Sequence, residues 1–66
     1  MEITINGTSR TIEAGSTVGT LLEHLGLAGK PVVVELNQRA LFSREFTAMI
    51  IPDAAVIEIV TLAAGG

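Results

Sequence analysis

The sequence contains no cysteine, tryptophan or tyrosine and only two phenylalanines. Without cysteine, the chain has neither a disulfide framework nor a thiolate metal ligand, which fits a reducing compartment. The four basic residues are scattered singly and the net charge is −3, so nucleic acid would meet neither a basic stripe nor aromatic stacking platforms. No apolar run is long enough to span a bilayer, and the N-terminus lacks the basic region of a signal peptide. These absences predict a cytoplasmic protein that binds neither nucleic acid nor membrane.

The chain has 66 residues, of which 48% are hydrophobic. These residues are mostly Ile, Leu, Val and Ala, a composition typical of a folded globule with an aliphatic core. A chain this short buries only about 60% of the surface that its unfolded form exposes, which leaves no room for an enzyme cleft. We therefore predict one domain over residues 1–62 that is not an enzyme and binds no cofactor or metal of its own.

The N-terminal half predicts a hairpin followed by a helix. Apolar and polar residues alternate over residues 1–6, and Asn6-Gly7 is a strong signal for a two-residue hairpin turn. The return strand covers about residues 9–13. Ser16 or Thr17 then caps a helix that ends at Gly26 in a left-handed conformation. Its apolar stripe consists of Val18, Leu21, Leu22 and Leu25.

The C-terminal half predicts three further strands. The first covers residues 32–36, and a turn at Asn37-Gln38 and Arg39 leads into a weaker strand at residues 40–42. An irregular stretch over residues 43–51 carries Phe46 and Met49 inward. After a turn at residues 52–54, the last strand covers residues 56–62 and has apolar residues on both faces, as a central strand does. The order ββαβββ predicts an α+β protein of the β-grasp (ubiquitin-like) type, with one helix packed across one face of a mixed sheet of four to five strands.

The last strand predicts a docking surface on the face of the sheet opposite the helix. If Ile57 and Ile59 point toward the helix, the residues between and after them point outward, together with two residues of the strand at 32–36. The outward set consists of Glu58, Val60, Leu62, Val33 and Glu35. An apolar patch flanked by two carboxylates suits a partner with an apolar groove and a basic rim. Alternatively, these positions simply carry residues that favour a central strand.

The chain ends in Ala64-Gly65-Gly66, and we predict that residues 63–66 form a flexible tail. Glycine has no Cβ, so the backbone of this tail can pass through a slot too narrow for other residues, and its carboxylate is open to attack. Extended from residue 61, the tail reaches about 20 Å, far enough to enter another protein's active site. The alternative is a frayed terminus without a function.

Several short motifs resemble the sulfur carrier proteins of thiamin biosynthesis, the ThiS family. The resemblance runs over the whole chain, and its order and spacing are more specific than any one motif. It rests on Thr17-Val18 with Leu21-Leu22, on Val34-Glu35-Leu36-Asn37, on Arg44 with Phe46, on Asp53, on Ile57-Glu58-Ile59-Val60 and on Ala64-Gly65-Gly66. The chain departs from the family at Asp53-Ala54-Ala55, where relatives commonly have Asp-Gly-Asp, and at Phe42-Ser43-Arg44, where they have Val-Pro-Arg.

The resemblance implies that the carboxylate of Gly66 is the point at which cargo is attached. A partner resembling the ubiquitin-activating enzymes, an adenylyltransferase, would use ATP to adenylate it, because this chain has no phosphate-binding loop. A sulfur donor such as a cysteine desulfurase relay would then produce a thiocarboxylate, and thiazole synthase would accept the sulfur. The chain itself would be a co-substrate that supplies no catalytic side chain.

Three other interpretations remain open at this point. The small subunit of molybdopterin synthase, or another sulfur carrier, has the same fold and the same Gly-Gly end, although the molybdopterin carriers are usually longer. A ubiquitin-like modifier would use the same tail to form isopeptide bonds with lysines. A β-grasp interaction module would have an inert tail, and the same holds if the sequence is an isolated piece of a larger chain.

Overall fold

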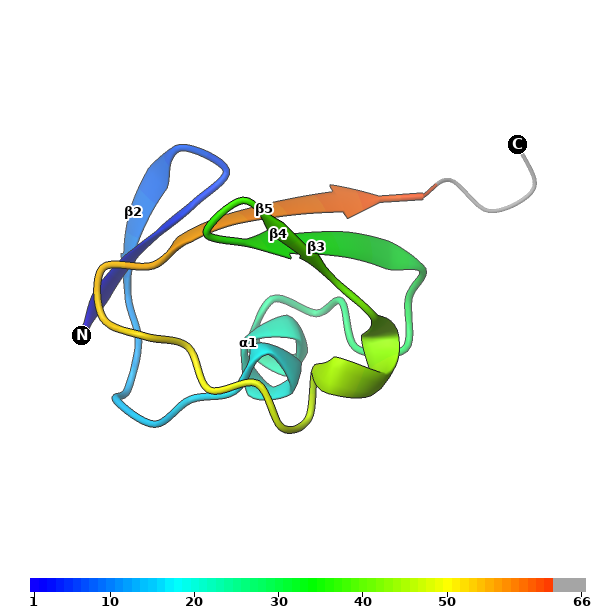
Figure 1. Cartoon of the computed structure of the whole chain (residues 1–66), viewed down its shortest axis with the longest axis horizontal. Helices are drawn as coiled ribbons and strands as arrows, with labels where there is room; N and C mark the ends of the chain where they lie inside the picture. The colour runs from blue at the N-terminus through cyan, green and yellow to red at the C-terminus, as the bar shows by residue number, and fades with distance from the viewer. Residues whose placement is uncertain (63–66) are drawn as a thin grey trace.

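The computed structural model describes residues 1–62, so the predicted tail with Ala64, Gly65 and Gly66 lies outside the described residues. Within them, five strands form one sheet in the order β2-β1-β5-β3-β4, and α1 lies across one face of it (Figure 1). The predicted ββαβββ order and the β-grasp architecture are confirmed. The elements are β1 (Glu2–Ile5), β2 (Thr8–Thr11), α1 (Val18–His24), β3 (Val32–Leu36), β4 (Arg39–Leu41), the 3-10 helix η1 (Ser43–Glu45) and β5 (Val56–Thr61).

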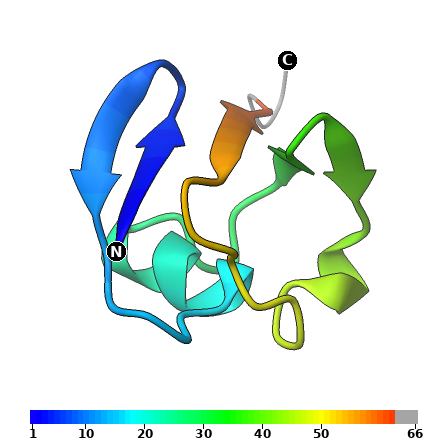
Figure 2. The same cartoon turned by 60° about the vertical axis from the view of Figure 1, so that its left-hand side comes forward.

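Strand β5 lies in the middle of the sheet, as its apolar residues on both faces predicted. It runs parallel to β1 on one side and antiparallel to β3 on the other, and Figure 2 shows it between the two hairpins. Its pairing with β1 is short and ends where Ile5 meets Ile57, whereas its pairing with β3 covers five residue pairs. The strand that leads to the tail is therefore held mainly by β3.

Helix α1 is only seven residues long and depends on its caps and on packing. Thr17 is its N-cap, and Thr17 and Thr20 exchange side-chain and backbone hydrogen bonds in a capping box. At the other end Gly26 has a φ of 74°. There Leu27 N–H donates to Leu22 O at 2.8 Å, and Gly26 N–H donates to Glu23 O at 3.1 Å. These two bonds form a Schellman motif, and the predicted left-handed glycine is confirmed.

The core lies between α1 and the inner face of the sheet and is aliphatic, as predicted. Phe46 and Met49 pack against it half-buried, so the irregular stretch does carry both of them inward. The buried residues are Ile3, Ile5, Val18, Leu21, Leu22, Val34, Leu36, Leu41, Ile51, Ala55, Ile57 and Ile59.

The two hairpins differ from the prediction by one or two residues. β2 covers Thr8–Thr11 rather than residues 9–13, because the turn contains only Asn6 and Gly7 and pairing begins at Ile5 with Thr8. β4 covers Arg39–Leu41 rather than residues 40–42. There Asn37 and Gln38 both have positive φ, 49° and 70°, and form a two-residue turn that pairs Leu36 directly with Arg39.

Candidate functional site

The five predicted docking residues lie on the outer face of the sheet, as the alternation indicated. Ile57 and Ile59 point to the core, with exposed fractions of 0% and 8%. The outward residues are all exposed; they are Val33 and Glu35 on β3, Glu58 and Val60 on β5, and Leu62 directly after β5. Leu62 continues the pairing because its N–H donates to Pro31 O at 2.9 Å. The outer-face geometry is therefore confirmed, whereas docking remains a prediction.

The strand register places like side chains next to each other on this face. Val33 lies opposite Val60, and Glu35 lies opposite Glu58. The exposed fractions of the two valines are 42% and 57%. Like charges placed directly opposite each other on neighbouring strands destabilise a sheet. We call Glu35 and Glu58 the acidic pair. Repulsion between their carboxylates on this exposed face lowers the stability of the sheet.

Phe42 extends the apolar surface and was not among the predicted docking residues. It is 64% exposed. Leu41 pairs with Val34, so the same register places Phe42 beside Val33. The Arg44 guanidinium lies over its ring, 4.6 Å from the centroid. The alternation from the inward Leu41 to the outward Phe42 was the sequence signal that could have placed Phe42 on the outer face, whereas its position beside Val33 follows only from the strand register. We call Val33, Phe42, Val60 and Leu62 the apolar patch.

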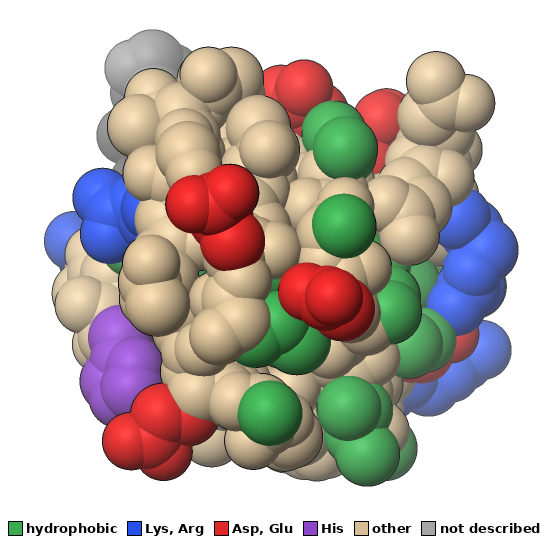
Figure 3. Space-filling view, turned by 90° about the vertical axis from the view of Figure 1, so that its left-hand side faces the viewer, with side chains coloured by type: hydrophobic (Ala, Val, Ile, Leu, Met, Phe, Trp, Pro, Cys, Tyr) green, Lys and Arg blue, Asp and Glu red, His purple; other side chains and the backbone are tan. Residues whose placement is uncertain are grey.

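The charges near the patch are only partly paired. Within residues 1–62, Arg39 and Glu45 form the one ion pair, at 3.4 Å, so the acidic pair has no basic partner in this part of the chain. Glu45 also accepts a hydrogen bond from the Phe42 N–H at 2.7 Å. This bond, assisted by Arg39, holds the pKa of Glu45 below its ordinary value. Figure 3 shows a different part of the surface, the end that lies on the left in Figure 1, where acidic side chains lie across the middle and basic ones at the two margins.

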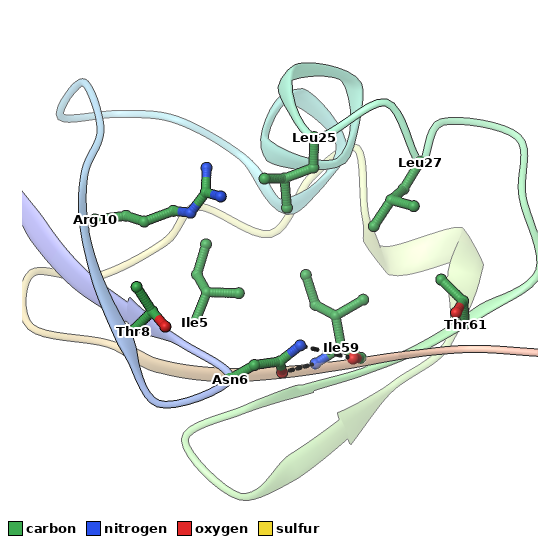
Figure 4. Close-up of a pocket in the computed structure, with 8 residues that line it drawn as sticks. All are labelled: Ile5, Asn6, Thr8, Arg10, Leu25, Leu27, Ile59 and Thr61. Atoms are coloured by element: carbon green, nitrogen blue, oxygen red, sulfur yellow. Dashed lines mark hydrogen bonds between the residues drawn. The ribbon is translucent and has the colours of Figure 1, made fainter.

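Two asparagine side chains form hydrogen bonds with the backbone of β5, one at each edge of the strand. The Asn6 amide donates to Ile59 O at 3.0 Å and accepts from Ile59 N–H at 2.8 Å, as the dashed lines in Figure 4 show. On the other side, Asn37 Oδ1 accepts from Val56 N–H at 2.8 Å. Asn6 was predicted only as a turn residue. Its amide in fact pairs with β5 beyond the point where β1 ends, as a further strand residue would.

In residues 1–62 no three His, Asp or Glu side chains are grouped so that they could hold a metal ion. No helix in the same range is both long and apolar enough to cross a bilayer.

Comparison with known proteins gives concordant matches over the whole chain. The sequence model of the ThiS family matches residues 3–66. The sulfur carrier protein ThiS of Thermus thermophilus is 37% identical over 62 residues, which cover 94% of this chain and 95% of that protein. A thiazole synthase of Magnetococcus marinus is 35% identical over 66 residues, and the chain spans 20% of its length.

Solved structures of similar proteins agree with the fold. The crystal structure of the thiamine biosynthesis protein ThiS of Geobacter metallireducens matches with a TM-score of 0.84 and 32% sequence identity, over the full length of both chains. The solution structure of a thiamine biosynthesis protein from the same organism matches with a TM-score of 0.77, over all of this chain and 88% of that one.

Proposed function

This chain belongs to the ThiS family, and from that premise we propose that it is a sulfur carrier for thiazole formation in thiamin biosynthesis. The observation that carries the proposal is the match to this family over residues 3–66, which includes the Gly-Gly end. The carrier is a co-substrate and not a catalyst. Gly66 holds the cargo, and Gly65 and Ala64 form the narrow part of the tail that precedes it.

The proposed chemistry takes place on the carboxylate of Gly66. A carboxylate is a poor electrophile, so an adenylating partner first joins it to the AMP portion of ATP and releases pyrophosphate. The sulfur of a persulfide, formed by a cysteine desulfurase relay, then displaces AMP. A thiol reduces the resulting acyl disulfide and leaves a thiocarboxylate. Thiazole synthase takes the sulfur and returns Gly66 as a carboxylate. The ATP site belongs to the partner.

The outer face of the sheet is the proposed docking surface for the adenylating partner. The apolar patch offers exposed aliphatic and aromatic surface close to the start of the tail, and the acidic pair lies beside it without a basic partner from residues 1–62. A partner with an apolar groove and a basic rim would cover the patch and neutralise the two carboxylates. The second proposed partner, thiazole synthase, is supported by the Magnetococcus marinus protein of that name, which contains a segment similar to this chain.

Intact mass spectrometry tests the proposed cargo. The protein is incubated with ATP, an adenylating enzyme and a sulfur donor, beside a variant that lacks Gly66. Exchange of oxygen for sulfur has nearly the same mass as methionine oxidation, so the product is also trapped with a thiol-alkylating reagent and mapped to the C-terminus. A trapped C-terminal adduct that the variant lacks supports the proposal. Adenylation without a thiocarboxylate would instead favour a modifier that is conjugated to lysines, and neither product would favour an inert interaction module.

Val60→Asp tests the docking face. Val60 is 57% exposed, so the fold should tolerate the change, whereas a charge in the middle of the apolar patch should abolish most adenylation. Val56→Asp is the matched control, because Val56 is also an exposed valine of β5, 46% exposed, but lies at the end of the strand away from the tail. Equal adenylation rates in the two variants, with both folded by circular dichroism, would leave Val60 with a structural role only.

A further inference from the structure

A groove of about 410 Å³ lies on the inner side of the sheet, on the face opposite the apolar patch. Figure 4 shows it between the β1–β2 hairpin, the end of α1 and the last residues of β5. Ile5, Ile59, Leu25 and Leu27 supply apolar surface. The Arg10 side chain reaches into the groove from β2 (Figure 4), and Thr61 lines the end nearest the tail.

Strand β5 has an open edge beside this groove. The N–H and C=O groups of its residues alternate between the two margins: Leu62 N–H faces β3, where it donates to Pro31, and Ile59 pairs on the other side with the Asn6 amide. The backbone of Thr61 faces the same side as that of Ile59. Pairing with β1 has already ended at Ile57, and no backbone group of residues 1–62 pairs with Thr61 there. An unpaired strand edge next to an apolar groove is suited to an added strand.

The hydrophobic core also ends beside Thr61. Thr61 lies on the inner face in line with the buried Ile57 and Ile59, yet it is exposed. Leu25 and Leu27 across the groove are only half-buried. Apolar surface thus remains accessible beside the position where the backbone edge is open.

We propose that this groove binds a short extended segment of the adenylating partner. Its backbone pairs with Thr61, an aliphatic side chain fills the space between Leu25 and Ile59, and a carboxylate lies against Arg10. The acidic character of the segment follows from charge complementarity, because Arg10 is the charged residue of the groove lining and forms no ion pair within residues 1–62. The inference rests on the proposed function and deepens it by naming a second contact with that partner.

The position of the groove favours a partner that acts on the tail carboxylate, and the adenylating partner is the one proposed to cover the outer face of the same strand. Gly66 lies five residues beyond Thr61, a span of at most about 18 Å along an extended chain. A protein whose backbone pairs with Thr61 therefore binds the strand where the tail starts and limits the positions that the carboxylate can reach. With the apolar patch on the outer face, the partner would hold β5 from both faces of the sheet.

The test compares affinities of full-length variants for the adenylating enzyme, together with ATP–pyrophosphate exchange. Thr61→Pro removes the N–H that the added strand needs, and proline is tolerated at an open strand edge. Thr61→Val is its control, because it keeps the N–H and the β-branched shape. Arg10→Glu reverses the charge of the groove, and Lys30→Glu changes the net charge equally at another site. We expect Thr61→Pro and Arg10→Glu to weaken binding about tenfold or more and the two controls to bind like the wild type.

Three results would overturn the inference. The first is unchanged affinity of the folded Arg10→Glu variant, which settles the question even if Thr61→Pro does not fold. The second is a loss seen with thiazole synthase but not with the adenylating enzyme, which would mean that the occupant is a different partner. The third is a wild-type chain that is not adenylated at all, in which case the proposed function fails as well. Wild-type adenylation with unaffected variants would refute the groove contact and leave the proposed function standing.

Discussion

Replacing Asn6 with alanine removes two hydrogen bonds from the central strand and places an alanine at a φ of 48°. A net contribution of about 0.5–1.5 kcal/mol for each hydrogen bond gives a loss of about 1–3 kcal/mol. The left-handed conformation adds about 1–2 kcal/mol for a residue with a Cβ and no local polar group. The expected total is about 2–5 kcal/mol. A domain of this length has a free energy of unfolding of roughly 3–10 kcal/mol, so the variant should be barely stable.

Two further substitutions separate these contributions. Asn6→Gly relieves the backbone strain and still loses both hydrogen bonds, so it should cost less than Asn6→Ala. Asn6→Asp keeps the acceptor for Ile59 N–H, but it replaces the donor with a carboxylate oxygen that faces Ile59 O. We expect it to be less stable than the wild type at neutral pH.

Urea unfolding followed by far-UV circular dichroism is the assay, because the chain has no tryptophan or tyrosine for fluorescence. Hydrogen exchange at Ile59 N–H reports the bond directly and should be faster in Asn6→Gly. If Asn6→Gly were as stable as the wild type within about 0.3 kcal/mol, with unchanged exchange at Ile59, the amide would not support β5 and the reasoning would be wrong.

Two other predictions concern charges. Because the Phe42 N–H, assisted by Arg39, holds the pKa of Glu45 below its ordinary value near 4.5, this carboxylate stabilises the fold above that pH. Its contribution is lost as the pH falls through the lowered pKa, so the melting temperatures of the wild type and Glu45→Gln should converge between pH 6 and pH 3; a constant difference would contradict this. Glu58→Gln removes the charge opposite Glu35 and should raise the stability in urea by roughly 0.2–1 kcal/mol at low salt. The gain should shrink in 1 M NaCl, and a loss of stability would show that the two charges do not repel measurably.

Patterns local in the sequence predicted most of the fold. Alternation over the last strand assigned Ile57 and Ile59 to the core and Val60 to the outer face, and all three positions are confirmed. Turn and cap signals at Asn6-Gly7 and at Gly26 were equally reliable, because each depends on the conformations that one or two residues can adopt. Strand ends were off by one or two residues, since pairing with a neighbouring strand determines them.

Features that join distant residues were not predicted. The Asn6 amide meets Ile59, 53 residues away in sequence, and nothing within the hairpin indicates that partner. Phe42 joins the apolar patch only because the second hairpin turns in two residues and fixes the register of β4. The open edge at Thr61 likewise depends on where β1 stops beside β5. In each case the property belongs to the pairing of strands, which a single segment does not encode.

The hydrogen bonds at the end of β5 affect how precisely a tail carboxylate can be positioned in a partner's reactive site. Beyond Leu62 the chain to Gly66 spans at most about 14 Å, so a partner that holds Leu62 must place its reactive site within that distance. If the last residues of β5 could fray, the start of the tail would vary by several ångströms, and part of the binding energy would be spent on ordering it. Pairing with β3 through Leu62 and the Asn6 amide at Ile59 both oppose fraying. The stability of this strand end and the efficiency of the proposed adenylation are therefore linked, although Asn6 itself does not need to contact the partner.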